Sequence, residues 1–491
     1  MLYALILIPI VAGLVSLALP TERPQRAILV AAALAHLSLT IAALARLPAP
    51  GLSGWIRADA LGLSFLTITS ALFFAAAVYA VGYLHREVET PKADWVEGTL
   101  FSNAPQRVFV GCMLLFLGAM TLVTLSHHLG LLWVAMEATT LASAPLIYFH
   151  RHHRSLEATW KYLLICSVGI ALALLGTFFL AVAASGPGGK TLPLVLGDLI
   201  SGANQLQPTW LKAAFLLLLI GYGTKMGLAP LHTWLPDAHS ESPSLVSALM
   251  SGALLNCAFL GILRVFQVMN AAGEGPFAQG LLIAFGLLSM GVAAVFIVRQ
   301  MDYKRMLAYS SVEHMGILAL GVGVGGAGTF GALFHAFNHS LAKGLLFLVA
   351  GNILAYARST STKRVEGLLR VLPISGPLWV VGFLAITGAP PFGSFVSEFT
   401  ILQASIAQGH TVVAVLYLIL LAVVFIGMAT IVLKMAQGEP HEKPVRLHRE
   451  AVLAVAPPIV LALAVLLLGI YLPTGLERTL DGAAALLGGG R

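Results

Sequence analysis

The sequence predicts an all-α membrane protein, a polytopic bundle of about fourteen helices that cross the bilayer. Of its 491 residues, 58% are hydrophobic and only 10% are charged, whereas a typical soluble domain carries about 25% charged residues. Apolar runs of near 20 residues recur along the whole chain. A helix of about that length crosses a hydrocarbon core of about 30 Å.

Fourteen apolar runs, separated by loops, define the expected spans. They cover residues 2–19, 27–47, 60–84, 107–126, 129–149, 157–184, 210–228, 243–268, 277–298, 304–323, 329–356, 373–405, 411–436 and 449–472. The first run has no basic leading segment and no small-residue cleavage motif, so we expect a retained helix rather than a signal peptide.

Basic residues are distributed unequally between the two sets of loops. The loops after odd-numbered spans carry nineteen lysines and arginines, and the opposite loops, to which we assign Arg264, carry seven. Loops rich in Lys and Arg stay in the cytoplasm. We therefore expect a multi-pass protein of the cell inner (plasma) membrane with both termini on the non-cytoplasmic side.

No motif in the chain indicates redox or hydrolytic chemistry. Cys112, Cys166 and Cys257 lie inside apolar runs without CxxC spacing, which argues against disulfides, iron–sulfur clusters and zinc sites. We expect no catalytic residue, no cofactor, no metal and no nucleic-acid partner. Whether the chain belongs to an enzyme complex stays open at this point.

The stretch Gly221–Ser251 interrupts the seventh span with polar residues. Lys225 follows an apolar run, and Gly227 and Pro230 predict a helix break directly after it. His232, Asp237 and His239 come next. Irregular backbone at membrane depth survives only where protein or a water-filled cavity covers it, and an ionisable group there indicates a functional site. The alternative is a structural kink with a lysine that reaches the surface.

One further charge is expected to lie within the membrane near this break. Glu137 lies in the middle of the fifth span, in LLWVAMEATTLAS, and must be protonated or paired with a cation. We expect Lys225 to be its partner, so that each group changes the proton affinity of the other. The alternative is a static ion pair that fixes helix packing.

The eleventh span carries a row of ionisable residues. His335, His339 and Lys343 stand at i, i+4 and i+8 and share one helical face, which favours proton transfer along the row. The two histidines alone could bind a metal, but no third ligand is evident and the lysine argues against it. Glu398 follows the break Gly388–Gly393 in the twelfth span and is expected to face its cavity.

A second pair lies in the tenth span. Glu313 and His314, in AYSSVEHMG, are secondary candidates for the same pathway, and a structural role is equally open for them.

The two interrupted spans occupy corresponding positions in two halves of the chain, which is the sequence sign of internal repeats in transporters. We expect N-terminal helices in 1–106, a first five-helix repeat in 107–268, a second, inverted repeat in 277–436, and a last helix with a tail in 449–491.

Three motifs, KMGLAPLHTWLPDAHSESPSLVSALMSG, DYKRMLAYSSVEHMG and GAPPFGSFVSEF, resemble the antiporter-like subunits of respiratory complex I, of Mrp cation/proton antiporters and of membrane-bound [NiFe] hydrogenases. The LLNCA, SSVEHMG and VSEF segments are most similar to the F-type subunit of hydrogenase-4 and formate hydrogenlyase. The resemblance implies fourteen helices with breaks in helices 7 and 12. It also implies an input pair at Glu137 and Lys225, a relay at His335, His339 and Lys343, and the ionisable group of broken helix 12 at Glu398. Asn256 stands where members of complex I often carry a lysine, so His232 or water would bridge the gap.

The resemblance implies a proton-translocating subunit of a redox-driven complex, with other membrane subunits and peripheral redox subunits as partners. Two alternatives stay open: a subunit of an Mrp-type antiporter, in which Na⁺ takes part, and a scaffold subunit with a vestigial channel.

Overall fold

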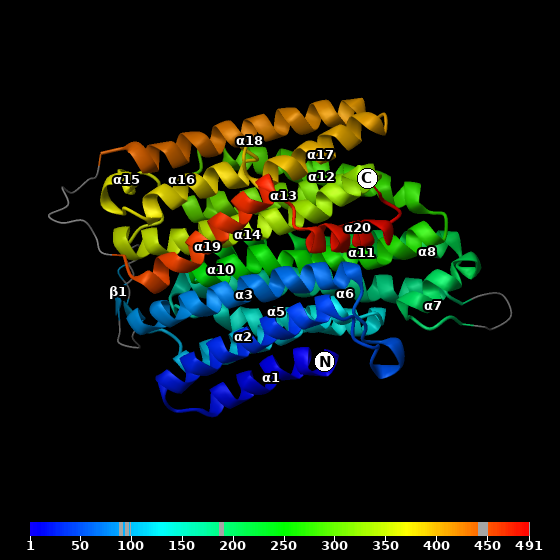
Figure 1. Ribbon diagram of the computed structural model, residues 1–491, viewed down its shortest axis with the longest axis horizontal. Helices are drawn as coiled ribbons and strands as arrows, with labels where there is room; N and C mark the ends of the chain where they lie inside the picture. The colour runs from blue at the N-terminus through cyan, green and yellow to red at the C-terminus, as the bar shows by residue number, and fades with distance from the viewer. Residues whose placement is uncertain (88–91, 94–97, 99, 186–190, 440–449, 491) are drawn as a thin grey trace.

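The structure is a computed structural model that describes residues 1–491 except 88–91, 94–97, 99, 186–190, 440–449 and 491. It is almost entirely helical. Figure 1 shows long helices lying side by side, with α1 at one edge of the bundle and α18 at the other. The α-helices are α1 (Leu2–Ala18), α2 (Glu22–Ala45), α3 (Ala60–Arg86), α4 (Gln106–Leu125), α5 (Leu129–Ile147), α6 (His153–Ala183), α7 (Leu196–Ser201), α8 (Pro208–Met226), α9 (Trp234–Glu241), α10 (Ser244–Leu249), α11 (Leu255–Ala271), α12 (Gly275–Ile297), α13 (Tyr303–Val324), α14 (Ala327–Ala357), α15 (Leu368–Val371), α16 (Ser375–Ile386), α17 (Gly393–Ala407), α18 (Thr411–Gln437), α19 (Val452–Ile470) and α20 (Thr474–Ala485).

Each of the fourteen expected spans is helical, as predicted. Within the described residues, eleven helical stretches are long and apolar enough to cross a membrane, and α1 and α16 are apolar but shorter. Short 3₁₀ turns η1 (Leu52–Gly54) and η2 (Ala203–Gln205) and a two-stranded hairpin of β1 (Lys92–Ala93) and β2 (Leu100–Phe101) lie between helices. The chain is therefore a multi-pass membrane protein.

Both predicted helix breaks are present. The helix α8 ends one residue after Lys225, at Met226, and Gly227 caps it in the left-handed conformation at φ 83°. The twelfth span divides into α16 and α17, and Gly388 between them has φ 64°. Glycine is the residue that adopts this backbone conformation without a steric penalty.

The eighth span contains an irregular turn that the sequence did not predict. Between α10 and α11, residues Met250–Leu254 form a π-helical turn, η3. A side chain at Gly252 would meet Leu72 Cδ2 at 2.4 Å and the carbonyl oxygen of Ser340 at 3.1 Å. The glycine therefore allows η3 to approach α14 closely. Such π turns occur often at functional sites.

The helix α14 runs through the middle of the bundle. α13, α16, α17, α19 and α10 pack around it, and nearly all of its residues from Gly328 to Ala350 are buried.

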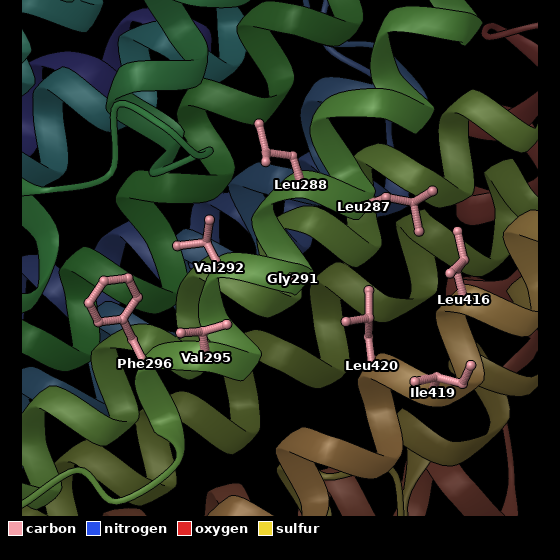
Figure 2. A pocket seen from close by; sticks show the side chains of 9 residues that line it. All are labelled: Leu287, Leu288, Gly291, Val292, Val295, Phe296, Leu416, Ile419 and Leu420. Carbon is pink, nitrogen blue, oxygen red and sulfur yellow. The ribbon is translucent and has the colours of Figure 1, made fainter.

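Outer helices, in contrast to α14, expose apolar side chains. A hollow of about 520 Å³ lies between α12 and α18 and is lined by leucine, isoleucine, valine, phenylalanine and glycine only; Figure 2 shows these lining residues. This face has the character of a surface that meets lipid tails or another apolar helix.

One assignment from the sequence was wrong. Arg264 does not lie in a loop but is fully buried in α11. Its guanidinium forms two hydrogen bonds, of 2.6 and 2.8 Å, to the carboxylate of Asp59 at the start of α3. Asp59 also caps α3 by accepting from the backbone N–H of Gly62 at 2.8 Å.

Candidate functional site

The buried ionisable residues form two clusters on either side of α11. The first surrounds Lys225, whose side chain is fully buried near the end of α8. Its ammonium donates hydrogen bonds to the hydroxyl of Thr140 on α5 and, over 2.9 Å, to the hydroxyl of Tyr162 on α6. The ammonium also lies 5.0 Å from the centre of the Tyr162 ring. Three helices therefore hold one cation in place.

Glu137 is not the direct ion-pair partner of Lys225 that the sequence predicted. Its carboxylate accepts from Thr140 at 3.3 Å and from Ser167 at 3.2 Å, and the ion pairs of the described residues do not include it. Thr140 thus joins the two charged groups through its hydroxyl. Glu137 is only half-buried, and Ser167 beside it is exposed on α6.

The second cluster is built on the row predicted in α14. His335, His339 and Lys343 are fully buried and all face α13. The Lys343 ammonium donates to the carbonyl of Leu307 at 2.6 Å and to the hydroxyl of Ser310, and it interacts electrostatically with the buried carboxyl group of Glu313. The row faces other polar residues, as its spacing predicts.

His314 lies at the centre of this cluster. Its ring centroid is 5.0 Å from those of both His335 and His339, and its Nδ1 is 2.8 Å from Nε2 of His335. Nδ1 of His335 is 2.9 Å from the Ser397 hydroxyl on α17. Glu398 follows directly, is 7% exposed, and its Oε1 has no hydrogen-bond partner among the described residues.

His239 extends the cluster toward the end of the bundle that carries most basic loops. It is fully buried in α9 and stacks on Phe347 of α14 at 5.0 Å. Neither ring nitrogen has a hydrogen-bond partner among the described residues, and the ring interacts electrostatically with Lys343 and Lys304. Buried polar atoms are nearly always satisfied, by water where protein is absent, so the site around His239 is suited to water.

A polar hollow of about 760 Å³ opens beyond His239. It lies where the end of α3, the end of α14 and the start of α10 meet, and it is lined by residues such as Glu241, Ser242, Lys304 and Arg358. The Lys304 ammonium donates to the carbonyls of Ser240 and Ser242 at 2.9 and 2.6 Å. Lys304 therefore stands between the hollow and the buried row.

The helix α11 is the contact between the two clusters. α11 packs against α8, which carries Lys225, and Asn256 of α11 donates to the Ser340 hydroxyl at 2.7 Å, next to His339. Oδ1 of Asn256 has no hydrogen-bond partner among the described residues, which leaves a place for a bridging water.

The other two candidates of the first break lie apart from this contact. His232 is buried beside Tyr309, with ring centroids 6.2 Å apart, and its Nδ1 is unpartnered among the described residues. Asp237 pairs with Arg305 at 2.7 Å and with Lys161 at 3.0 Å near the surface. Asp237, on α9, therefore connects basic side chains of two other helices, α6 and α13, rather than joining the buried row.

The sequence reasoning missed the hydroxyl residues that complete both clusters: Thr140, Tyr162, Ser310 and Ser397. Helical spacing offered a signal for two of them. Thr140 stands at i+3 from Glu137, and Ser310 stands four residues before His314, so each shares a face with a residue already singled out. No signal in the sequence pointed to the pairing of Arg264 with Asp59, because these residues lie far apart along the chain.

Residues 126–425 match the family described as NADH:quinone oxidoreductase/Mrp antiporter, transmembrane. The match covers more than half of the chain and includes both clusters. The chain belongs to this family. It is an antiporter-like membrane subunit of the complex I, Mrp and hydrogenase group.

Relatives within the NADH:quinone oxidoreductase/Mrp antiporter family agree with this assignment. The hydrogenase-4 component F homolog of Methylacidiphilum infernorum (isolate V4) is 37% identical over 395 residues, which cover 79% of this chain and 80% of the relative. The Na(+)/H(+) antiporter subunit A1 of Staphylococcus haemolyticus (strain JCSC1435) is 29% identical over 87% of this chain, which spans 53% of that relative. A chain of respiratory complex I from Thermus thermophilus with bound NADH superimposes with a TM-score of 0.81, 26% identity and full coverage of both chains.

Proposed function

We propose that this subunit conducts protons across the membrane and is driven by redox partner subunits of a hydrogenase-4, formate hydrogenlyase or NADH:quinone oxidoreductase type of complex. The observation that carries the proposal is the buried row of Lys343, His339, His314, His335 and Glu398 in the centre of an apolar bundle. Ionisable groups within a membrane are costly and mark ion pathways. Packing alone would be served better by apolar side chains.

The proposed path starts at the polar hollow on the side of the basic loops, which we assign to the cytoplasm. A proton passes from the hollow by way of Lys304 and His239 to Lys343, along the histidines of α13 and α14, and then to Glu398 on α17. This path differs from the one through His232 that the sequence indicated. The electrostatic links of His239 to Lys343 and Lys304 support it.

Lys225 and Glu137 form the control element in this proposal. Removing negative charge from Glu137 would make the Thr140 hydroxyl a poorer bridge and favour proton release from Lys225. The released proton, or the changed field, would reach the α14 row through Asn256 and Ser340. The two five-helix units, inverted relative to each other, would each contribute one cluster. The matching breaks after α8 and α16 support that division.

A neighbouring membrane subunit is expected to cover Glu137. The carboxylate is half-buried, and apart from Ser167 the exposed side chains near it on α5 and α6 are apolar: Val134, Leu141, Leu164 and Val168. A carboxylate that faces lipid tails is unfavourable, so a partner with a hydrogen-bond donor or a cation would stabilise it there. Movement of such a donor in the partner would couple redox chemistry to Lys225.

Two substitutions test the proposal in the assembled complex. Lys225→Ala and Glu137→Gln are expected to abolish donor-driven proton pumping into sealed vesicles, because each removes one charge of the control element. Lys212→Ala, on the same helix but in a surface pair with Glu274 at 2.9 Å, and Glu157→Gln on the exposed face of α6 are the matched controls. Unchanged pumping in Lys225→Ala would overturn the mechanism and favour a scaffold role.

Sodium/proton exchange is the second candidate, favoured by the similarity to the Na(+)/H(+) antiporter subunit A1. Exchange driven by a sodium gradient in the absence of an electron donor would support it. Pumping that needs the donor and is the same with and without sodium would support the redox-driven function.

A further inference from the structure

We propose that His314, His335 and Glu398 form a binding site for one divalent transition-metal ion, for which Zn²⁺ has the best-matched chemistry, and that the bound ion blocks proton transfer from α14 to α17. The first part rests on geometry alone. The blocking effect rests on the proposed proton pathway.

Three ligand atoms converge at this point from three helices. One ring nitrogen each of His314 on α13 and His335 on α14, and one carboxylate oxygen of Glu398 on α17, lie within 4.8 Å of one another, and all three residues are buried. From the sequence, the candidate pair of metal ligands was a different one, His335 and His339 along one helix, and no third ligand was evident. The structure provides the third ligand across the helix interface.

The hydrogen bonds on the outer side of each ring direct lone pairs toward the centre. When the Ser397 hydroxyl donates to the carbonyl of Ser394 at 2.9 Å, it can accept from Nδ1–H of His335, which lies 2.9 Å away. The backbone carbonyl of Ile386 lies near the His314 ring and can accept from its outer N–H. With both outer nitrogens protonated, Nε2 of His335 and Nδ1 of His314 face each other over 2.8 Å with their lone pairs. In this tautomeric state, a shared proton or a metal ion satisfies both lone pairs.

This arrangement is also the usual surrounding of a metal-bound histidine. Ligating histidines normally donate their other N–H to a carbonyl or another acceptor, which fixes the tautomer and the ring orientation. Ile386 and Ser397 supply those acceptors here. The carboxylate of Glu398, whose Oε1 has no hydrogen-bond partner among the described residues, adds the negative charge that a divalent ion needs.

The ligand set determines the class of ion. Two imidazoles and one carboxylate match catalytic-type zinc coordination, whereas Ca²⁺, Mg²⁺ and Na⁺ prefer sites made of oxygen atoms. Zn–N distances of about 2.0–2.1 Å in a tetrahedral site require about 3.3 Å between the two nitrogens. The rings therefore need to separate by about 0.5 Å. The proton held between them leaves to solvent, because metal ligands must be deprotonated.

The test uses the full-length chain in lipid nanodiscs, freed of metal by chelation and titrated with CoCl₂. Tetrahedral Co²⁺ absorbs visible light strongly, and ZnCl₂ is expected to displace it. Wild type should bind one Co²⁺ per chain with this absorption. His314→Gln and Glu398→Gln should weaken binding at least tenfold. Ser397→Ala, which leaves all three ligands in place, should weaken it by about 10- to 100-fold through loss of ring orientation.

His36→Gln is the matched control. His36 is equally buried but bridges Ser70 and Thr121 at 2.9 Å, far from the cluster, and its variant should bind Co²⁺ like wild type. Absence of the absorption in wild type, or ligand variants that bind like wild type, would overturn the site.

The second readout is donor-driven proton pumping by the parent complex with and without ZnCl₂. Zinc should inhibit pumping at the concentration that displaces Co²⁺. If cobalt binds but zinc leaves pumping unchanged, the blocking effect is overturned and the site stands. If Lys225→Ala still pumps, the proton pathway fails independently of the metal result.

Discussion

At the scale of single residues, Thr140 is the group on which communication between Glu137 and Lys225 depends. It accepts from the lysine and donates to the carboxylate, so a proton or a change in field passes through one hydroxyl.

Thr140→Val should lower pumping by about tenfold relative to donor oxidation. The substitution keeps the side-chain shape but removes a hydrogen bond to a charged group, worth about 1.5–3 kcal/mol, and each 1.4 kcal/mol corresponds to a factor of about ten in rate. The ratio of protons moved to donor oxidised is the measurement. Thr177→Val on α6 serves as the control, since its hydroxyl is buried and donates only to the carbonyl of Ala173. Equal ratios in the two variants would contradict the role of Thr140.

Gly388→Ala should impair pumping because it displaces Glu398. A Cβ at Gly388 would lie 2.0 Å from Oε2 of Glu398. Gly409→Ala is the matched control. Gly409 has φ 79° and therefore a left-handed backbone like that of Gly388, but nothing lies within 4 Å of the position that a Cβ would take. Both variants should lose about 1–2 kcal/mol of stability through the backbone. Only Gly388→Ala should also lose proton transport, measured in vesicles after normalising for assembled protein.

Much of the candidate site could be predicted at this scale, because His335, His339 and Lys343 follow helical spacing within one segment. The hydrogen-bonded bridge of the Thr140 hydroxyl between Glu137 and Lys225 could not be predicted in this way, because the distance between the two charged groups depends on how α5 and α8 pack. The central place of His314 likewise follows from the crossing of α13 and α14. Neither the packing of α5 and α8 nor the crossing of α13 and α14 can be predicted from a local sequence pattern.

At the scale of helices, the hydropathy of the sequence was enough to predict the fourteen spans, because membrane insertion depends on local composition. Glycine and proline were enough to predict the two helix breaks, because backbone sterics are also local. The short helices α7 and α20 were not predicted. α20 is amphipathic and packs against α3 and α14, so its position depends on tertiary contacts. The π-helical turn in the eighth span also escaped prediction, since it reflects the close approach of Gly252 to α14.

The pair of Asp59 and Arg264 joins α3 to α11 and has a predictable response to acid. Burial alone would raise the pKa of the Asp59 carboxyl, but the charge and hydrogen bonds of Arg264, with a smaller contribution from His127, hold that pKa far below its usual value. A carboxyl with a depressed pKa stabilises the fold above its unfolded-state pKa of about 3.9 and loses that contribution as the pH falls through lower values.

Asp59→Asn should therefore destabilise the protein by about 3–5 kcal/mol at pH 7, since it leaves a buried arginine without its counter-charge. The difference from wild type should shrink as the pH falls below about 4. Thermal unfolding of both proteins between pH 7 and pH 3 measures it. Asp198→Asn at an exposed position on α7 should unfold like wild type throughout. A difference that stays constant down to pH 3 would show that the charge of Asp59 is not the cause.

At the scale of the whole molecule, the unequal distribution of basic residues predicts the orientation in the membrane. The three native cysteines are buried, so introduced cysteines should report sidedness. Arg151→Cys lies between α5 and α6, and Thr209→Cys lies at the start of α8; both positions are exposed. In intact cells a membrane-impermeant thiol reagent should label Thr209→Cys and not Arg151→Cys. The reverse labelling would invert the proposed direction of proton movement.

The half-buried position of Glu137 has a consequence for reconstitution. When the chain is purified alone, acyl tails or detergent replace whatever neighbour covers this carboxylate in a complex, and a bare negative charge is unfavourable in that setting. The solitary subunit would then lack the neighbour that stabilises this carboxylate and, through the Thr140 hydroxyl, its link to Lys225. We expect bilayers that contain only this chain to be nearly impermeable to protons, with conductance returning when the adjoining subunits are added back.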